Sequence, residues 1–260
     1  MPAYQSALAI VAHPDDAEFG CAGTLALWAR EGWQVYLAIC TDASGGGSDD
    51  ARDVGPAARR VITDTRKAEQ HAAAAVLGLR GVFFLDYPDG LLTPSLDLRR
   101  DLVRLIRTVR PTRLLCQSPE RTWKPSYSVP RHHPDHLAAG AATMAAMYPA
   151  AQNPWDFPEL LAEGLEPHKV RELFVTSAPE INFAVDISST LDVKIASLRA
   201  HHSQLGADFE RVETLVREWA ANNGQAHNLP AAEVFHRAEN YRPSSPSRSG
   251  SAGNGACGSF

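Results

Sequence analysis

An unbroken apolar run, Ala7-Leu8-Ala9-Ile10-Val11-Ala12, leads directly into the polar turn His13-Pro14-Asp15-Asp16. A continuous apolar run of this kind is typical of a strand that is covered on both faces, as in a parallel sheet. A helix is expected over 23–30, and Gly32 separates it from a second apolar run over 35–40. Strand, helix and strand in this order predict a βαβ unit with two parallel strands.

The same alternation continues along the chain. Further helices are expected over 65–77, 95–109, 135–148, 191–201 and 208–221, and further strands over 82–85, 113–116, 173–177, 183–187 and 233–241. Between 42 and 64 the chain carries Gly45-Gly46-Gly47 and polar residues without a clear period, which predicts a long loop at the carboxyl edge of the second strand. The pattern as a whole predicts an α/β fold with a layered, parallel sheet.

The composition indicates one enzyme-sized domain. The chain has 260 residues, of which 44% are hydrophobic and 21% charged, so it can bury a substantial core. No internal repeat or composition break interrupts residues 1–242, which we interpret as a single domain. The last eighteen residues, 243–260, include six Ser, four Gly and two Pro. They offer too little apolar surface to offset the entropy of ordering, so a disordered tail is expected.

Charge and cysteine content exclude several classes of protein. Lys plus Arg number 25 against 30 for Asp plus Glu, and the formal net charge of -5 gives no broad attraction to nucleic acid or anionic lipid. The four cysteines form no C-x-x-C pair, which argues against a thiolate zinc site or a disulfide framework. No stretch has the pattern of a signal peptide or a membrane helix. We therefore expect a cytoplasmic protein without nucleic-acid or membrane partners.

The first chemical motif is the turn that follows the first strand. In open α/β sheets, ligands bind beyond the carboxyl ends of the strands, so His13, Asp15 and Asp16 are placed where chemistry normally occurs. An imidazole and a carboxylate on one turn can converge on a cation, while the neighbouring carboxylate remains free as a base. Spacing alone does not say which aspartate has which role.

A second motif opens the helix expected over 135–148. His133 and His136 are three residues apart and occupy neighbouring positions of a first helical turn. A lone His-x-x-Asp is more often a helix cap than a metal site, but two such clusters at separate strand-to-helix junctions reverse those odds. Two imidazoles and one carboxylate suit catalytic zinc, and iron(II) uses the same ligand types. Such an ion polarises a carbonyl and activates water, which indicates a hydrolase.

Histidines outside these motifs carry weaker signals. His71, His168, His227 and His236 stand alone and are expected to be structural or exposed. His201 lies on a late helix beside Ser203 and Gln204, and a local structural role and a contribution near the site are equally open for it.

The two motifs in this order resemble the LmbE-like, or PIG-L, family of zinc-dependent N-acetyl-sugar deacetylases. The resemblance rests on Ala12-His13-Pro14-Asp15-Asp16-Ala17-Glu18 and His133-Pro134-Asp135-His136, with support from Arg66, Glu69, Val185-Asp186-Ile187, Lys194 and His201-His202-Ser203-Gln204. It implies a three-layer, Rossmann-like, mostly parallel sheet with helices on both faces. It also implies that the chain removes acetyl groups from N-acetylglucosamine-type conjugates, and it admits homo-oligomers.

The resemblance assigns roles residue by residue. It implies that His13, Asp16 and His136 bind the metal, zinc or alternatively iron(II), and that Asp15 is the general base. It implies that His133 stabilises the oxyanion and protonates the leaving amine, with Asp135 hydrogen-bonded to an imidazole, expected to be that of His133, to keep it protonated. Arg66 resembles a sugar-hydroxyl contact.

Two other functions remain open at this level. An amidase that acts on thiol S-conjugates, or on another non-sugar amide, would use the same chemistry, and the loops over 43–64 and 117–131 are expected to select the substrate. A nucleotide-binding Rossmann module is the alternative from another class, since Asp42 ends the second strand where a ribose-binding acid is expected. The G-x-G-x-x-G fingerprint is missing, and the carboxylates in its place would repel a pyrophosphate.

Overall fold

The computed structural model describes residues 5–123 and 132–240, and a seven-stranded sheet forms its centre. In chain order the strands are β1 (Ser6–Val11), β2 (Gln34–Thr41), β3 (Gly81–Tyr87), β4 (Arg113–Gln117), β5 (Glu172–Thr176), β6 (Phe183–Asp186) and β7 (Ala232–Glu239). Across the sheet their order is β3-β2-β1-β4-β5-β7-β6. Neighbours from β3 to β5 pair in parallel, whereas β7 is antiparallel to both β5 and β6. The predicted α/β fold with a mostly parallel sheet is confirmed.

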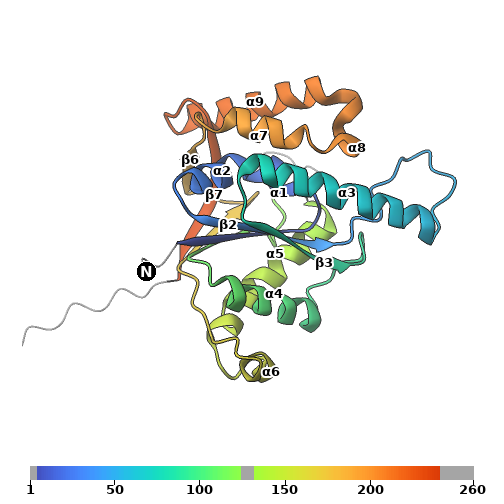
Figure 1. The fold of residues 1–260 in the computed structure, drawn as a ribbon. Helices are drawn as coiled ribbons and strands as arrows, with labels where there is room; N and C mark the ends of the chain where they lie inside the picture. The colour runs from blue at the N-terminus through green and yellow to red at the C-terminus, as the bar shows by residue number, and fades with distance from the viewer. Residues whose placement is uncertain (1–4, 124–131, 241–260) are drawn as a thin grey trace, which may run out of the picture.

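Helices cover both faces of this sheet (Figure 1). They are α1 (Asp16–Gly20), α2 (Ala22–Arg30), α3 (Pro56–Leu77), α4 (Leu96–Val109), α5 (Pro134–Met147), α6 (Pro158–Ala162), α7 (Leu191–Leu198), α8 (His202–Leu205) and α9 (Phe209–Ala226). In Figure 1, α4, α5 and α6 lie below the sheet and α1, α2 and α3 above it, with α7 packed against α2 and α3 from outside. The three-layer arrangement therefore carries an additional helical cover on one side.

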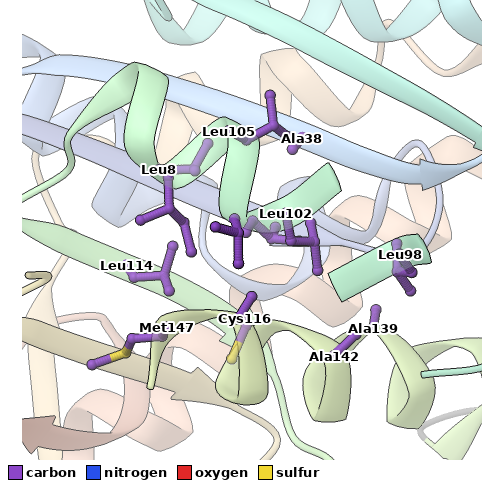
Figure 2. Packing of buried hydrophobic residues seen from close by; sticks show 14 of the residues in the cluster. Leu8, Ala38, Leu98, Leu102, Leu105, Leu114, Cys116, Ala139, Ala142 and Met147 are labelled. Atoms are coloured by element: carbon purple, nitrogen blue, oxygen red, sulfur yellow. The ribbon is translucent and has the colours of Figure 1, made fainter. Parts of the chain in front are cut away.

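Strand β1 shows why its apolar run is unbroken. Leu8 and Ile10 point into the core between the sheet and helices α4 and α5, and Figure 2 shows Leu8 there among Leu102, Leu114 and Met147. The alternate residues, including Ala9, pack into the second core on the opposite face. Since successive side chains of a strand point to opposite faces, both sets are apolar only when both faces are covered.

Helix α3 begins earlier than the sequence pattern predicts. The long loop expected over 42–64 ends at Gly55, which caps the helix in an extended conformation, and Pro56 occupies the first turn. The first two turns of α3 extend past the sheet and are mostly exposed; Val61 is 66% exposed. These turns pack against no core, so their sequence has no apolar residues at helical spacing that would predict a helix.

The strand order places a crevice between β1 and β4. From β1 the chain proceeds outward to β2 and β3 on one side, and then returns to add β4 and β5 on the other. In such sheets ligands bind at the carboxyl ends of the strands, where the order reverses. The turn after β1 and the first turn of α5 meet at this point.

The remaining predictions concern regions outside this core. The expected tail over 243–260, and residues 124–131 of the expected loop over 117–131, lie outside the described residues, and the single domain over 1–242 stays a prediction. Along 5–123 and 132–240, no helix combines the length and the apolar character required to cross a bilayer.

Gly140 allows α5 to approach β4 closely. A Cβ at Gly140 would lie 2.4 Å from the carbonyl oxygen of Gln117, which is backbone and has little freedom to move. We expect Gly140→Ala to lower the free energy of unfolding by about 1–3 kcal/mol, as overpacked cores do. Thermal unfolding should show a melting temperature lower by roughly 2–4 °C per kcal/mol for a domain of this size. The matched control is Gly206→Ala, whose added methyl meets no atom within 4 Å; equal melting temperatures for both variants would contradict the packing argument.

Candidate active site

The two sequence motifs meet at the crevice. His13 lies in the turn two residues after β1, Asp16 begins α1, and His136 lies on the first turn of α5. One oxygen of Asp16 is 3.0 Å from Nε2 of His136, and the other is 3.4 Å from Nδ1 of His13. The Asp16 carboxylate thus lies between the two imidazoles, whose ring centres are 5.3 Å apart. The structure therefore brings together the three residues expected to bind the metal.

The donor chemistry of this cluster fits a divalent transition metal. One nitrogen each of His13, His133 and His136 can be chosen so that all three lie within 4.8 Å of one another, and the Asp16 carboxylate adds an oxygen between two of them. Two imidazoles and a carboxylate, with space left for water or substrate, are the ligands of catalytic zinc, and non-haem iron(II) sites use the same types.

The charged groups of the cluster shift one another's pKa values. Burial acts to lower the pKa of His13, but its hydrogen bonds to Asp135, Asp16 and Asp89 prevail and raise the pKa to about 12. Burial acts to raise the pKa of Asp16, but hydrogen bonds to His13 and His136 hold that pKa well below its usual range. Asp16 is therefore ionised across the physiological range, as a metal-binding carboxylate must be.

Asp135 contacts a different imidazole from the one expected. Its Oδ2 lies 3.1 Å from Nε2 of His13, not beside His133, and it also accepts a hydrogen bond from the backbone N–H of Gly90 at 2.7 Å. Oδ1 accepts from the N–H of Leu92 at 3.1 Å, so this fully buried carboxylate is held on both sides. A carboxylate on Nε2 leaves Nδ1 of His13 free to face Asp16 and a cation, which is the usual support of a metal-binding histidine.

His133 is not kept protonated in the way the resemblance implies. Its Nδ1 accepts a hydrogen bond from the backbone N–H of Asp135 at 3.2 Å and thereby caps α5. Burial and the charge of His13 lower the pKa of His133. Because Nδ1 is an acceptor, the neutral ring carries its proton on Nε2 and can donate a hydrogen bond from that atom.

Asp15 stands apart from the cluster. Its carboxylate accepts a hydrogen bond from Nη2 of Arg66 at 3.3 Å, while His13 and His136 pair with Asp16. Burial and the charge of Asp16 raise the pKa of Asp15 to about 7, against the lowering effect of Arg66. A carboxylate with a pKa near neutrality is suited to accept and return a proton. The geometry thus separates the two adjacent aspartates, which spacing alone leaves undivided.

These residues line a cavity of about 380 Å³, within the range of small-molecule sites. Its lining consists of His13, Asp15, Asp16, Gly45, Gly46, Arg66, Asp89, Gly90, His133 and His136. Arg66 is 6% exposed, and the glycine loop lies against it: a Cβ at Gly46 would be 2.4 Å from Nη1. The position of Arg66 in the wall supports its expected contact with substrate.

Asp89 is a site residue that the sequence motifs do not reveal. Its Oδ1 lies 3.0 Å from Nε2 of His13, and its Oδ2 accepts from the backbone N–H of Gly45 at 2.9 Å. Burial acts to raise its pKa, but the hydrogen bond with His13 lowers it. Asp89 follows β3 at the carboxyl edge of the sheet. The rule that ligands bind at this edge was the available signal, and a lone Asp-Gly there reads equally well as a turn.

Sequence comparison finds a family and known proteins that are similar to this chain. The family model PIG-L, described as GlcNAc-PI de-N-acetylase, matches residues 8–147. Diacetylchitobiose deacetylase of Thermococcus kodakarensis is 30% identical, over 87% of this chain and 80% of the relative. A 1D-myo-inositol 2-acetamido-2-deoxy-alpha-D-glucopyranoside deacetylase of Rhodococcus erythropolis is 28% identical, over 81% of this chain and 86% of the relative.

A solved structure of a known deacetylase is also similar to this chain. N,N'-diacetylchitobiose deacetylase from Pyrococcus horikoshii superposes with a TM-score of 0.80 and 25% identity, over 91% of this chain and 85% of that one. These relatives are sugar deacetylases by name, so they favour neither a nucleotide-binding module nor a non-sugar amidase. The chain belongs to the PIG-L family and is an amide hydrolase of the deacetylase type, as the paired motifs predict.

Proposed function

We propose that the protein removes the acetyl group from an N-acetylglucosamine-type amino sugar within a glycoconjugate, and that zinc, or alternatively iron(II), is its metal. One observation carries the proposal: the Asp15 carboxylate lines the same cavity as the His13–Asp16–His136 cluster but does not pair with its histidines. Base and metal ligands are thus separate groups that face the same space. The names of the relatives in both comparisons support the choice of an N-acetyl sugar.

The residues of the cavity can carry the proton transfers of amide hydrolysis. A divalent ion bound by His13, Asp16 and His136 would supply Lewis-acid activation of water and of the acetamide carbonyl. Asp15 takes a proton from the attacking water as the new carbon–oxygen bond forms. The carbonyl oxygen becomes an oxyanion, to which Nε2–H of His133 donates a hydrogen bond.

The second half of the reaction breaks the carbon–nitrogen bond. The leaving nitrogen needs a proton, and acetate and a free amine are then released. Burial and the charge of His13 lower the pKa of His133, which favours the neutral ring with its proton on Nε2. We therefore assign this proton to Asp15, which holds the one taken from water, and keep His133 as the oxyanion donor. This revises the expectation that His133 protonates the amine.

Substrate hydroxyls would meet Arg66 in the cavity wall. Gly46→Ala would add a methyl group 2.4 Å from Nη1 of Arg66 and force the guanidinium to shift. Because hydrogen bonds from charged groups contribute about 1.5–3 kcal/mol, we expect KM to rise about tenfold or more, and kcat to fall as well because Arg66 also donates to Asp15. The control Gly47→Ala lies in the same loop, but its methyl meets the end of Ile62 instead. Steady-state kinetics that give both variants the KM of the wild type would exclude Arg66 as a substrate contact.

A substrate panel tests the function itself. The panel contains N-acetylglucosamine, diacetylchitobiose, N-acetylglucosaminyl inositol, N-acetylglucosaminyl malate and N-acetylcysteine S-conjugates, assayed for release of free amine. Turnover of one sugar class, with the S-conjugates unchanged, is the expected result. Turnover of the S-conjugates alone would replace the sugar with a non-sugar amide.

We place this activity in the reducing cytoplasm, which is consistent with the buried, unpaired thiols of Cys21, Cys40 and Cys116.

A further inference from the structure

The backbone of Asp15 adopts a conformation that needs external support. Its φ angle is +83°, in the left-handed region that non-glycine residues seldom occupy. Such a conformation costs on the order of 1–3 kcal/mol and persists where surrounding groups fix it. The Asp15 side chain makes no capping hydrogen bond to α1, so the side chain does not itself stabilise the turn.

Two residues of α3 hold the peptide group that joins Pro14 to Asp15. Nη2 of Arg66 donates to the Pro14 carbonyl oxygen at 2.9 Å, and Oε1 of Gln70 accepts from the Asp15 N–H at 3.2 Å. Arg66 and Gln70 are four residues apart and therefore lie on the same face of the helix. Hydrogen bonds on both sides fix the plane of this peptide, and with it the direction of the Asp15 side chain.

Glu18 determines which way the Gln70 amide points. Gln70 is fully buried and donates from Nε2 to Oε1 of Glu18, also fully buried, at 2.8 Å. Because the Glu18 oxygen is the acceptor of this bond, the NH2 group of Gln70 must face Glu18 and its oxygen must face Asp15. His201, fully buried as well, places Nε2 3.6 Å from the second oxygen of Glu18. Within the described residues, neither that oxygen nor a ring nitrogen of His201 has a hydrogen-bond partner.

We propose that Gln70, oriented by Glu18, is a positioning residue that sets the Asp15 carboxylate for proton transfer. The inference rests on the proposed function, because Asp15 is the base only if the chain is a deacetylase that uses it. Gln70 does not line the cavity, so its effect passes through Asp15. Loss of the hydrogen bond should lower kcat and leave KM unchanged, since a displacement of about 1 Å at a reacting group can cost roughly 100-fold in rate.

Three variants test the arrangement. Gln70→Met keeps the shape but replaces the amide with a thioether, which cannot donate to Glu18 and is only a weak acceptor for the Asp15 N–H. Gln70→Glu places a carboxylate against Glu18. In the exchanged pair Glu18→Gln with Gln70→Glu, the new amide at position 18 can donate to the new carboxylate at position 70, whose other oxygen accepts from the Asp15 N–H. The control is Lys67→Met, which removes a long α3 side chain that pairs with Asp86 away from the cavity.

Two readouts are needed for each variant, loaded with metal: steady-state kinetics, and hydrogen exchange of the Asp15 amide. Both single substitutions should lower kcat by about 30-fold or more, with KM within about twofold, and should lose protection of that amide. The exchanged pair should recover both quantities, whereas a residue needed only for stability would give no such recovery. Wild-type kcat in both folded single variants, or an exchanged pair no better than Gln70→Glu, would overturn the inference. If the wild type releases no amine while the exchange pattern holds, the proposed function fails, and the result supports only the hydrogen bond by which Gln70 holds the Asp15 backbone.

Discussion

Asp15→Asn is expected to lower kcat by about 100- to 10,000-fold, the range over which a general base contributes, while the protein keeps its metal. The amide preserves the size of the side chain and its contact with Arg66, but it cannot take a proton from water. Metal binding should persist because Asp16, not Asp15, lies beside His13 and His136.

The matched variant is Asp16→Asn, which makes the same change one residue along the chain. It should lose the metal, because Asp16 is the carboxylate between the two imidazoles. Metal content measured by elemental analysis, together with kcat at saturating substrate, separates the two roles. Equal loss of metal from both variants would refute the division of labour between the adjacent aspartates.

His136→Ala is expected to abolish activity through loss of the metal. Replacement of residues that merely support a ligand already lowers metal affinity about 10- to 100-fold, so removal of a ligand should cost at least the upper value. Titration of the metal-free protein with zinc measures this affinity directly. The control is His227→Ala, which removes an exposed imidazole that follows α9, far along the chain from both motifs. Wild-type zinc affinity in His136→Ala would remove His136 from the ligand set.

The sequence predicts the centre of the fold because the signals there are local. Each side of β1 packs into a separate core, so its whole apolar run is under the same constraint. The first turns of α3 are not predicted because they pack against no core. Their sequence is therefore polar without an apolar period, and such a sequence resembles a loop.

The site divides in a similar way. His13 and Asp16, and likewise His133 and His136, are close in sequence, so their spacing reveals them. Contacts across the crevice leave no such trace. The pairing of Asp135 with His13 depends on how α5 docks against β4, and His133 caps the helix through Nδ1. The family resemblance implies instead a hydrogen bond between Asp135 and His133, its neighbour in the motif.

Residues that act through the backbone are harder still to predict. Gln70 belongs to no motif, and Glu18 ends the first motif without a role assigned to it, so each alone reads as an ordinary polar residue of a helix. Only the structure shows that both side chains are buried and that the neighbouring Asp15 has a positive φ angle. His201 shows the same limit, because its buried position beside Glu18 cannot be read from the sequence.

The central claim is that a metal held by His13, Asp16 and His136 enables Asp15 to hydrolyse the acetamide of an amino sugar. The most direct measurement is the release of amine and acetate from the sugar panel by protein stripped of metal, before and after reloading with zinc or iron(II). We predict no release from the stripped protein, and restored release, with amine and acetate in equal amounts, after reloading. Unchanged release by stripped protein, or no release from any sugar by protein with metal bound, would contradict the account.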